Sequence, residues 1–210
     1  MKKHIGWIAG TTAAVLVAAG AITYAVAEDG SGGGGLSVPS AEGADAGFAR
    51  DMAVHHQQAV EMSYIIRDRT TDTEVRRLAY DIAQTQANQR GMLLGWLDLW
   101  DLPKVSAKPP MSWMGMGDMP ERGDGSLMPG MATDTELKKL GTLNGKQAEI
   151  FYLQLMTDHH KGGIHMAEGC VSKCTVEVEK NLAQGMVDAQ QSELATMKQM
   201  LKERGAKPRD

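Results

Sequence analysis

Residues 52–56, Met-Ala-Val-His-His, return as residues 156–160, Met-Thr-Asp-His-His, 104 positions further along this 210-residue chain. A further methionine, Met62 or Met166, follows each motif at the same spacing. Without any gap, the same offset pairs Leu78-Ala79 with Leu182-Ala183, Ile82 with Met186, Gln86 with Gln190, and Leu97 with Leu201. This regular match indicates an internal duplication, and the repeated unit decides the fold.

The repeated unit has the apolar periodicity of α-helices. In the first copy, a stripe with a period of 3.6 residues comprises Phe48, Met52, His55, Ala59, Met62 and Ile66. A second helix is predicted to open at a capping box, Thr71-x-x-Glu74, and to continue through Val75, Leu78, Ile82, Leu93 and Leu97. The first copy is therefore predicted to be an αα-hairpin.

The second copy follows the same plan with one extra short helix. This helix is predicted to open at Thr133-x-x-Glu136 and to end near Asn144-Gly145. A longer helix follows over about 146–168, and a last helix starts after Thr175 and ends before Gly205. Two αα-hairpins that each carry one apolar face bury those faces by packing together. We therefore predict an all-α fold, a four-helix bundle built from the first copy (45–100) and the second copy (133–204), with a tail at 205–210.

The N-terminal segment predicts export. Lys2 and Lys3 precede an uncharged, largely apolar run from Ile5 to Ala27, which ends in an Ala-x-Ala pattern. Because this run is close to the ~20 residues that span a bilayer, residues 1–27 are either a cleaved signal or a membrane anchor. Residues 28–44, rich in Gly and Ser, predict a flexible linker. Both alternatives place the remaining chain outside the cytoplasm, in the cell envelope or secreted.

The composition excludes some classes of protein and shows one anomaly. Aromatic residues make up only 5% of the chain, which disfavours a β-sandwich. The net charge is −4, and no basic patch alternates with aromatic residues, so the sequence does not predict nucleic-acid binding. The anomaly is methionine, with fifteen residues against two phenylalanines and four tyrosines.

The duplicated histidine pairs are candidate metal ligands. Neighbouring residues on a helix point about 100° apart, so one histidine of each pair can face the bundle centre while the other reaches toward an adjacent helix. Thioether and imidazole ligands together suit copper, particularly Cu(I), whereas di-iron bundles use Glu-x-x-His, which this chain lacks. The alternative is a core simply filled by these side chains. The candidate ligands are Met52, His55, His56, Met62, Met156, His159, His160 and Met166.

A long crossover between the two copies, residues 101–132, carries a second group of methionines among its prolines and glycines. Crossovers of this length without helical periodicity are frequently functional. Thioethers on such a backbone can gather around Cu(I), and the alternative is an apolar lid over the bundle. The candidate ligands here are Met111, Met114, Met116, Met119, Met128 and Met131.

Four further features belong to one or both copies. Cys170 and Cys174 predict a disulfide at the corner between the last two helices, with thiolate ligation of a metal as the alternative. His165 is a possible extra ligand. The glycines Gly162 and Gly163 either admit a neighbouring helix or are merely tolerated. The paired glutamines, Gln86 and Gln190, are either inter-helix hydrogen bonders or part of a solvated face.

These motifs together resemble a known family. Asp51-Met52-x-x-His55-His56-x-x-Ala59-x-x-Met62, its counterpart from Met156 to Ala167, and the central Trp113-Met114-Gly115-Met116 and Met128-Pro129-Gly130-Met131 resemble the domain-of-unknown-function family 305 over residues 45–204. The resemblance implies a ferritin-like four-helix fold and, as in CopM-like exported proteins, copper binding by Met and His in tolerance, buffering or delivery.

The sequence thus predicts an exported copper-binding protein that sequesters, buffers or delivers Cu(I) and is not an enzyme. No nucleophile motif or inward pairing of carboxylates suggests catalysis. The expected partners are copper ions and a copper-transport or cuproenzyme-maturation protein. Two alternatives remain, a copper-dependent oxidase or reductase outside the cytoplasm, and a structural envelope bundle without metal.

Overall fold

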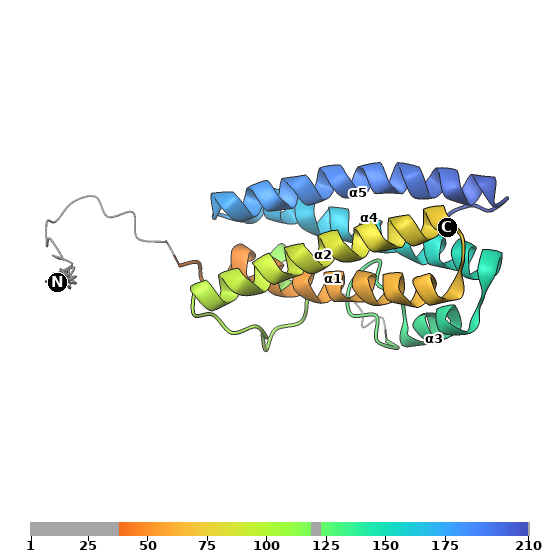
Figure 1. Cartoon of the computed structure of the whole chain (residues 1–210). Helices are drawn as coiled ribbons and strands as arrows, with labels where there is room; N and C mark the ends of the chain where they lie inside the picture. Colours follow the sequence, from red (N-terminus) through yellow and green to blue (C-terminus); the bar gives the residue numbers. More distant parts are fainter. Residues whose placement is uncertain (1–37, 119–122, 210) are drawn as a thin grey trace, which may run out of the picture. The chain divides into compact units, whose positions relative to one another are not determined.

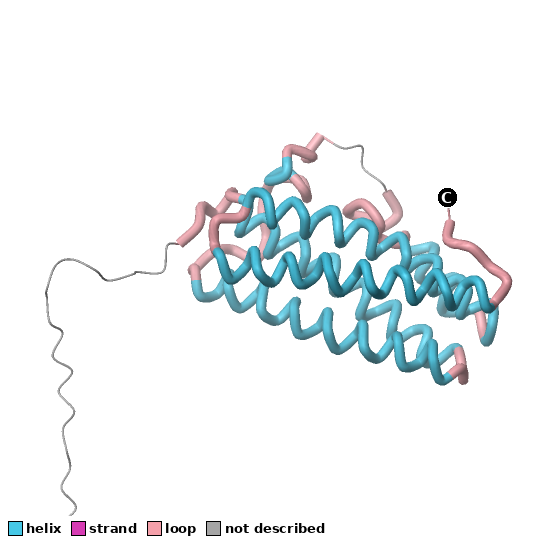
Figure 2. The backbone as a smooth tube through the Cα atoms, turned by 90° about the horizontal axis from the view of Figure 1, so that it is seen from above, coloured by secondary structure: helices cyan, strands magenta, loops and turns pink. Residues whose placement is uncertain are grey.

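Four long helices form the body of the structure, a computed structural model that describes residues 38–118 and 123–209 (Figure 1). Helix α1 spans Ala44–Arg69, α2 Thr73–Leu99, α4 Gly145–Lys173 and α5 Glu177–Glu203, with a short α3 at Asp134–Thr142 and a 3-10 turn, η1, at Ser112–Met114. No strand occurs among the described residues, as the tube in Figure 2 shows. The predicted all-α four-helix fold is therefore confirmed.

The predicted signal or anchor at 1–27 lies outside the described residues, as do most of the predicted linker and Met119. In the part of the chain that is described, no helix has the length and apolar character needed to cross a membrane. The last residues before α1 form a turn, in which the amide of Gly43 donates to the carbonyl of Ser40 over 2.9 Å. Arg50 of α1 holds this turn through the carbonyl of Ala41 at 2.7 Å.

Helices α2 and α3 start at side-chain caps, and one of the two caps is the predicted one. At α3, Thr133 and Glu136 form the predicted capping box. At α2, the N-cap is Asp72 and not Thr71, because the Asp72 carboxylate accepts the amides of Glu74 and Val75 at 3.0 and 2.9 Å. Aspartate is at least as good an N-cap as threonine, and the prediction of a capping box at Thr71 is therefore wrong by one residue.

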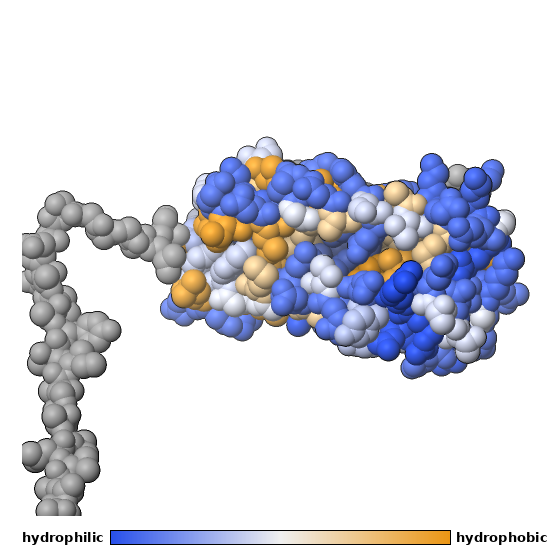
Figure 3. Space-filling model, turned by 45° about the horizontal axis from the view of Figure 1, so that its top comes forward, coloured by the Kyte–Doolittle hydropathy of each residue, from blue (hydrophilic) through white to orange (hydrophobic). Residues whose placement is uncertain are grey.

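The two hairpins meet along α1 and α4, which run in opposite directions (Figure 1). The predicted stripe on α1, from Phe48 to Ile66, is fully buried. One hydrophobic cluster joins the beginning of α1 to the end of α4, and a second joins the end of α1 to the beginning of α4. The paired histidines lie between the two clusters, halfway along both helices. Most of the surface seen in Figure 3 is hydrophilic, with apolar residues visible between the polar ones.

The crossover is held against α1 and α4. Near its middle, the Asp51 carboxylate accepts the backbone amide of Met111 at 2.7 Å and the indole N–H of Trp113 at 2.9 Å. At its end, the amide group of Gln58 exchanges two hydrogen bonds with the backbone of Ala132, at 2.9 and 2.7 Å. The crossover is therefore bound to α1 at both points, and it contacts α4 at Gly162 and Gly169.

The adjacent glycines Gly162 and Gly163 of α4 each leave room for a different neighbour. A Cβ at Gly162 would overlap the carbonyl oxygen of Pro129, so this glycine admits the crossover and not a neighbouring helix. A Cβ at Gly163 would meet the amide of Gln190 on α5. Gly130, with φ of +83°, completes the contact with α4, because its own Cβ would overlap the carbonyl of Asp158.

Candidate metal centre

The first histidine of each pair faces the centre of the bundle. The rings of His55 on α1 and His159 on α4 lie 3.7 Å apart between centroids, with an angle of 33° between their planes. Nε2 of His159 donates to the backbone carbonyl of His55 over 2.9 Å. Both side chains are fully buried. The two copies therefore meet at these histidines.

The second histidine of each pair faces its own hairpin partner. Nε2 of His56 lies 2.9 Å from the amide oxygen of Gln89 on α2, and Nε2 of His160 lies 2.6 Å from a carboxylate oxygen of Glu193 on α5. Gln89 and Glu193 are themselves 104 positions apart. The predicted division of each pair into one central and one lateral ring therefore matches the geometry.

These hydrogen bonds decide which nitrogen is free. Carbonyl and carboxylate oxygens only accept, so Nε2 carries the proton in His159 and His160, and the amide oxygen of Gln89 assigns it likewise in His56. In a neutral ring the lone pair then lies on Nδ1. Among the described residues, Nδ1 of His55, His56, His159 and His160 has no hydrogen-bond partner. The rings of His56, His159 and His160 thus each present an unpartnered Nδ1, whereas in His55 neither ring nitrogen has a hydrogen-bond partner among the described residues.

Burial keeps the rings of His55, His56 and His159 neutral. It lowers the pKa of His55 and of His159 well below the ordinary value, and neighbouring histidines lower both further. Burial also lowers the pKa of His56 to about 3, although the hydrogen bond to Gln89 opposes the change. A neutral imidazole is the form that binds a metal ion, so no proton competes for these rings at neutral pH.

The methionines of the two motifs lie on either side of the histidines. Met52 and Met166 belong to the first hydrophobic cluster, and Met62 and Met156 belong to the second. All four are fully buried. We call His55, His56, His159 and His160 the histidine layer. Because α1 and α4 are antiparallel, each side of this layer receives one thioether from each copy. The spacing along a single helix does not reveal this arrangement.

The four imidazoles do not converge on one point. Within the described residues, the one group of three or more His, Cys, Asp or Glu side chains whose ligand atoms lie within 4.8 Å of one another is Cys170, Cys174 and Glu179. A metal ion at the histidine layer would therefore be bound by at most two of these rings as they stand, and its other ligands would come from other side chains. This arrangement favours a soft ion with a low coordination number.

The crossover methionines fall into two groups. Met111, Met128 and Met131 are buried in the first hydrophobic cluster, as an apolar lid would be. Met114 and Met116 are only half-buried, and Met114 packs on α4 at Gly169. The sulfur of Met116 lies 3.4 Å from Nε2 of the exposed His165. Two ligands of one tetrahedral ion are about 3.5 Å apart, so this pair has the spacing of a chelate.

The remaining predicted features have mixed outcomes. Cys170 and Cys174 form the predicted disulfide. Gln86 and Gln190 are buried, so the solvated-face alternative is wrong, and the amide of Gln86 has no hydrogen-bond partner within the described residues. Gln89 and Glu193 were not predicted from the sequence. Their signal was a polar residue 33 positions after the second histidine in each copy.

Fold and site together define a class of protein, all-helical bundles with a buried layer of imidazole and thioether donors. The family model for a domain of unknown function, DUF305, matches residues 45–201. The chain therefore belongs to the DUF305 family. No curated protein matches it significantly.

Solved structures, two of them of DUF305 proteins, share the fold. A DUF305 protein assigned to the secreted proteins of Streptomyces coelicolor is 71% identical, with a TM-score of 0.76 over 81% of this chain and 99% of that one. A DUF305 fragment from Deinococcus radiodurans is 27% identical, with a TM-score of 0.62 over 76% and 96% of the two chains. CopM in its Cu(I)-bound form is 19% identical, with a TM-score of 0.58 over 76% and 96%.

Proposed function

We propose that this protein is an exported copper-binding protein that sequesters, buffers or delivers Cu(I) and has no catalytic turnover of its own. The observation that carries the proposal is the set of four buried Nδ1 atoms without a hydrogen-bond partner, three of them on rings whose Nε2 is already held by a second group. Burying a polar atom without a partner costs free energy. A bound ion would remove that cost.

The donor atoms favour copper over harder metals. Nitrogen of imidazole and sulfur of methionine are the ligands available around the layer, with buried methionines on both of its sides. Calcium and magnesium prefer sites built of several oxygen ligands, whereas the oxygens of Gln89 and Glu193 at this layer are already held by histidine rings. Cu(I) accepts thioethers and low coordination numbers, and CopM, which has the same fold, has been crystallised with it.

A second, outer site is part of the proposal. His165 and Met116 are accessible from solvent at the edge of the crossover, whereas the inner layer is covered. Met114 on the same turn offers a further sulfur. We assign to this pair the first capture of the ion, because it is the accessible combination of the two donor types.

Export is proposed from the N-terminal sequence and from the relative assigned to the secreted proteins. Outside the cytoplasm, a bound ion must eventually be stored or passed on. The expected recipient is a copper-transport or cuproenzyme-maturation protein. Anchoring through residues 1–27 would keep the bundle at the membrane surface.

Anaerobic Cu(I) titration against a chromophoric chelator tests the proposal. The chain from residue 36 onward should compete for Cu(I), and Ag(I) should displace it whereas Zn²⁺ should not. The quadruple variant of His55, His56, His159 and His160 to Gln should lose most high-affinity binding while keeping its helical circular dichroism. His165→Ala is the matched control and should retain the inner sites. Unchanged stoichiometry and affinity in the quadruple variant would refute the proposal, and sustained oxygen consumption with copper would favour an oxidase.

A further inference from the structure

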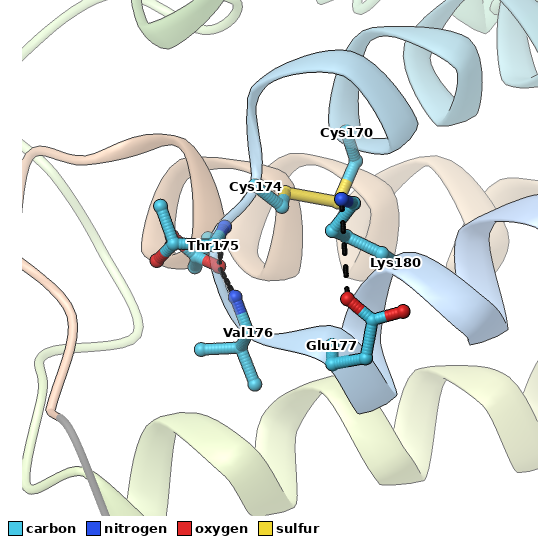
Figure 4. Close-up of a disulfide and its surroundings, with 7 residues drawn as sticks. Cys170, Cys174, Thr175, Val176, Glu177 and Lys180 are labelled. Atoms are coloured by element: carbon cyan, nitrogen blue, oxygen red, sulfur yellow. Dashed lines mark hydrogen bonds and ion pairs between the residues drawn. A yellow bond between two sulfur atoms is a disulfide. The ribbon is translucent and has the colours of Figure 1, made fainter.

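The corner between α4 and α5 contains a disulfide that links residues one helical turn apart. Cys170 lies in the last turns of α4 and Cys174 directly follows this helix, with Cα atoms 4.8 Å apart (Figure 4). The amide of Cys174 donates to the carbonyl of Cys170 over 2.8 Å, which continues the helical pattern. Since both cysteines belong to the same turn, the disulfide does not join α4 to α5. After reduction, the two sulfurs would remain neighbours on one helix face.

A buried carboxyl group faces these sulfurs. Glu179, in the first turn of α5, is fully buried, and neither of its carboxyl oxygens has a hydrogen-bond partner among the described residues. One ligand atom of each of Cys170, Cys174 and Glu179 lies within 4.8 Å of the others. An unpartnered carboxyl at this depth is costly, and packing alone does not require it.

The equivalent corner of the first copy has none of these groups. At the offset of 104, the positions of Cys170, Cys174 and Glu179 correspond to Ile66, Thr70 and Val75, all three buried. The same bundle corner can therefore be built from apolar and hydroxyl side chains. The chemistry-bearing set at the second corner is not a requirement of the fold.

The second corner also carries more buried acidic groups than the first. In the first, Glu149 binds the hydroxyl of Thr70 and is compensated by Arg204 at 2.7 Å. In the second, the equivalent acidic residue is Asp45, which accepts the amides of Thr175 and Val176 at 2.7 Å each. The position equivalent to Arg204 is Trp100, which brings no charge. The second corner thus holds two buried carboxyl groups, Asp45 and Glu179, and lacks the arginine that compensates Glu149 at the first corner.

We propose that the reduced corner is a metal site distinct from the histidine layer, in which the thiolates of Cys170 and Cys174 and the carboxylate of Glu179 bind a thiophilic divalent cation of the zinc class. Two sulfurs and one oxygen are ligands that Zn²⁺ takes in proteins. Three anionic ligands beside Asp45 favour a divalent ion over monovalent Cu(I). The disulfide closes the site, and reduction opens it.

Opening the site requires a two-electron reductant. An external dithiol gives two electrons and two protons to the S–S bond, which breaks to two thiols as the donor forms its own disulfide. Burial, together with the nearby carboxylate of Asp45, raises the pKa of Glu179 to about 9, so this group also holds a proton at neutral pH. Binding of Zn²⁺ then displaces one proton from each of the three ligands, about three in total.

The test compares Zn²⁺ binding by the oxidised and phosphine-reduced full chain, with proton release measured in weak buffer. The reduced protein should bind one more Zn²⁺ and release about three protons. Glu179→Gln, which is nearly isosteric with the protonated side chain, should bind at least about tenfold more weakly and release about two. No extra Zn²⁺ on reduction, or unchanged affinity and proton release in E179Q, would overturn the proposal.

A matched control comes from the chain itself. The triple variant C170I, C174T and E179V installs the first corner's residues at the second corner, and should fold, melt cooperatively and show no reduction-dependent site. Cu(I) binding at the histidine layer should persist in this variant, whereas the reduction-dependent Zn²⁺ site should persist in the quadruple histidine variant. These two variants therefore distinguish failure of the copper proposal from failure of the zinc proposal. A reduction-dependent Zn²⁺ site that survives in the triple variant would overturn this one.

Discussion

Nε2 of His160 donates a hydrogen bond to the carboxylate of Glu193 over 2.6 Å, whereas its counterpart His56 donates to the neutral amide of Gln89 over 2.9 Å. A carboxylate partner makes the opposite nitrogen of an imidazole a stronger ligand than an amide partner does. The two lateral histidines are therefore unequal, although they occupy equivalent positions in the two copies. The second copy should provide the tighter copper site.

Replacing Glu193 by Gln should weaken Cu(I) binding at the second copy about 10–100-fold, because the ring keeps its orientation but loses basicity. Anaerobic competition titration would measure the two affinities. The reciprocal variant, Gln89→Glu, should strengthen the first copy's site. Equal affinities in E193Q and the unmodified protein would show that His160 is not a ligand supported by Glu193.

The stability of the metal-free protein should fall in mild acid. Burial lowers the pKa of His55, His56 and His159 in the folded chain, so the unfolded chain binds more protons at any pH between these values and about 6.5. The contribution of these neutral rings to the free energy of unfolding is complete above about pH 6.5. It is lost as the pH falls, and the free energy of unfolding drops by about 2 kcal/mol per ring between pH 7 and pH 5. Denaturant unfolding at both pH values measures it. The variant His56→Gln should lose the part of this pH-dependent change in stability that comes from one ring. Equal stability of the unmodified protein at pH 5 and pH 7 would contradict the buried neutral state of the histidines.

Gly162→Ala should destabilise the protein by about 1–3 kcal/mol, because the new methyl group would overlap the carbonyl of Pro129 and push the crossover away. Gly185→Ala is the matched control, since a Cβ there has no neighbour within 4 Å. That variant should gain up to about 1 kcal/mol from helix propensity. Thermal melting of both would compare them. A stabilised G162A would mean that the crossover does not pack on α4.

Soft metal ions should raise the melting temperature. At a free concentration one hundred times its Kd, Ag(I) bound to one site of the native state adds about 3 kcal/mol, or about 5–10 °C for a chain of this size. Differential scanning calorimetry with and without Ag(I) measures the shift. The quadruple histidine variant should show little of it. An equal shift in that variant would locate the ion elsewhere.

Replacing methionine by leucine distinguishes a metal ligand from a residue that only packs, because the substitution removes the sulfur but preserves the side-chain volume. It usually costs less than about 1.5 kcal/mol of stability per site. We expect the set Met52, Met62, Met156 and Met166 to lose about tenfold or more in Cu(I) affinity when changed to leucine, since these sulfurs flank the histidines. The set Met111, Met128 and Met131 should lose less. The reverse order would favour the crossover as the principal copper site and the inner methionines as core.

The sequence by itself determined the helices, their apolar faces and the disulfide. These follow from spacing along one chain segment, which fixes the face of a helix to which a residue belongs, as with the stripe from Phe48 to Ile66. The N-cap of α2 was misjudged because Thr71 and Asp72 are adjacent and equally suited by chemistry.

Only the tertiary structure decided which histidine of each pair is central, that Gln89 and Glu193 hold the lateral rings, and that Gly162 admits Pro129 of the crossover. The tertiary structure also placed Met52 in the same hydrophobic cluster as Met166, and not in the cluster that contains Met62. The physical reason is that periodicity fixes angles within one helix. The rotation of each helix about its own axis, and its register against its neighbours, depend on how all the buried side chains pack together.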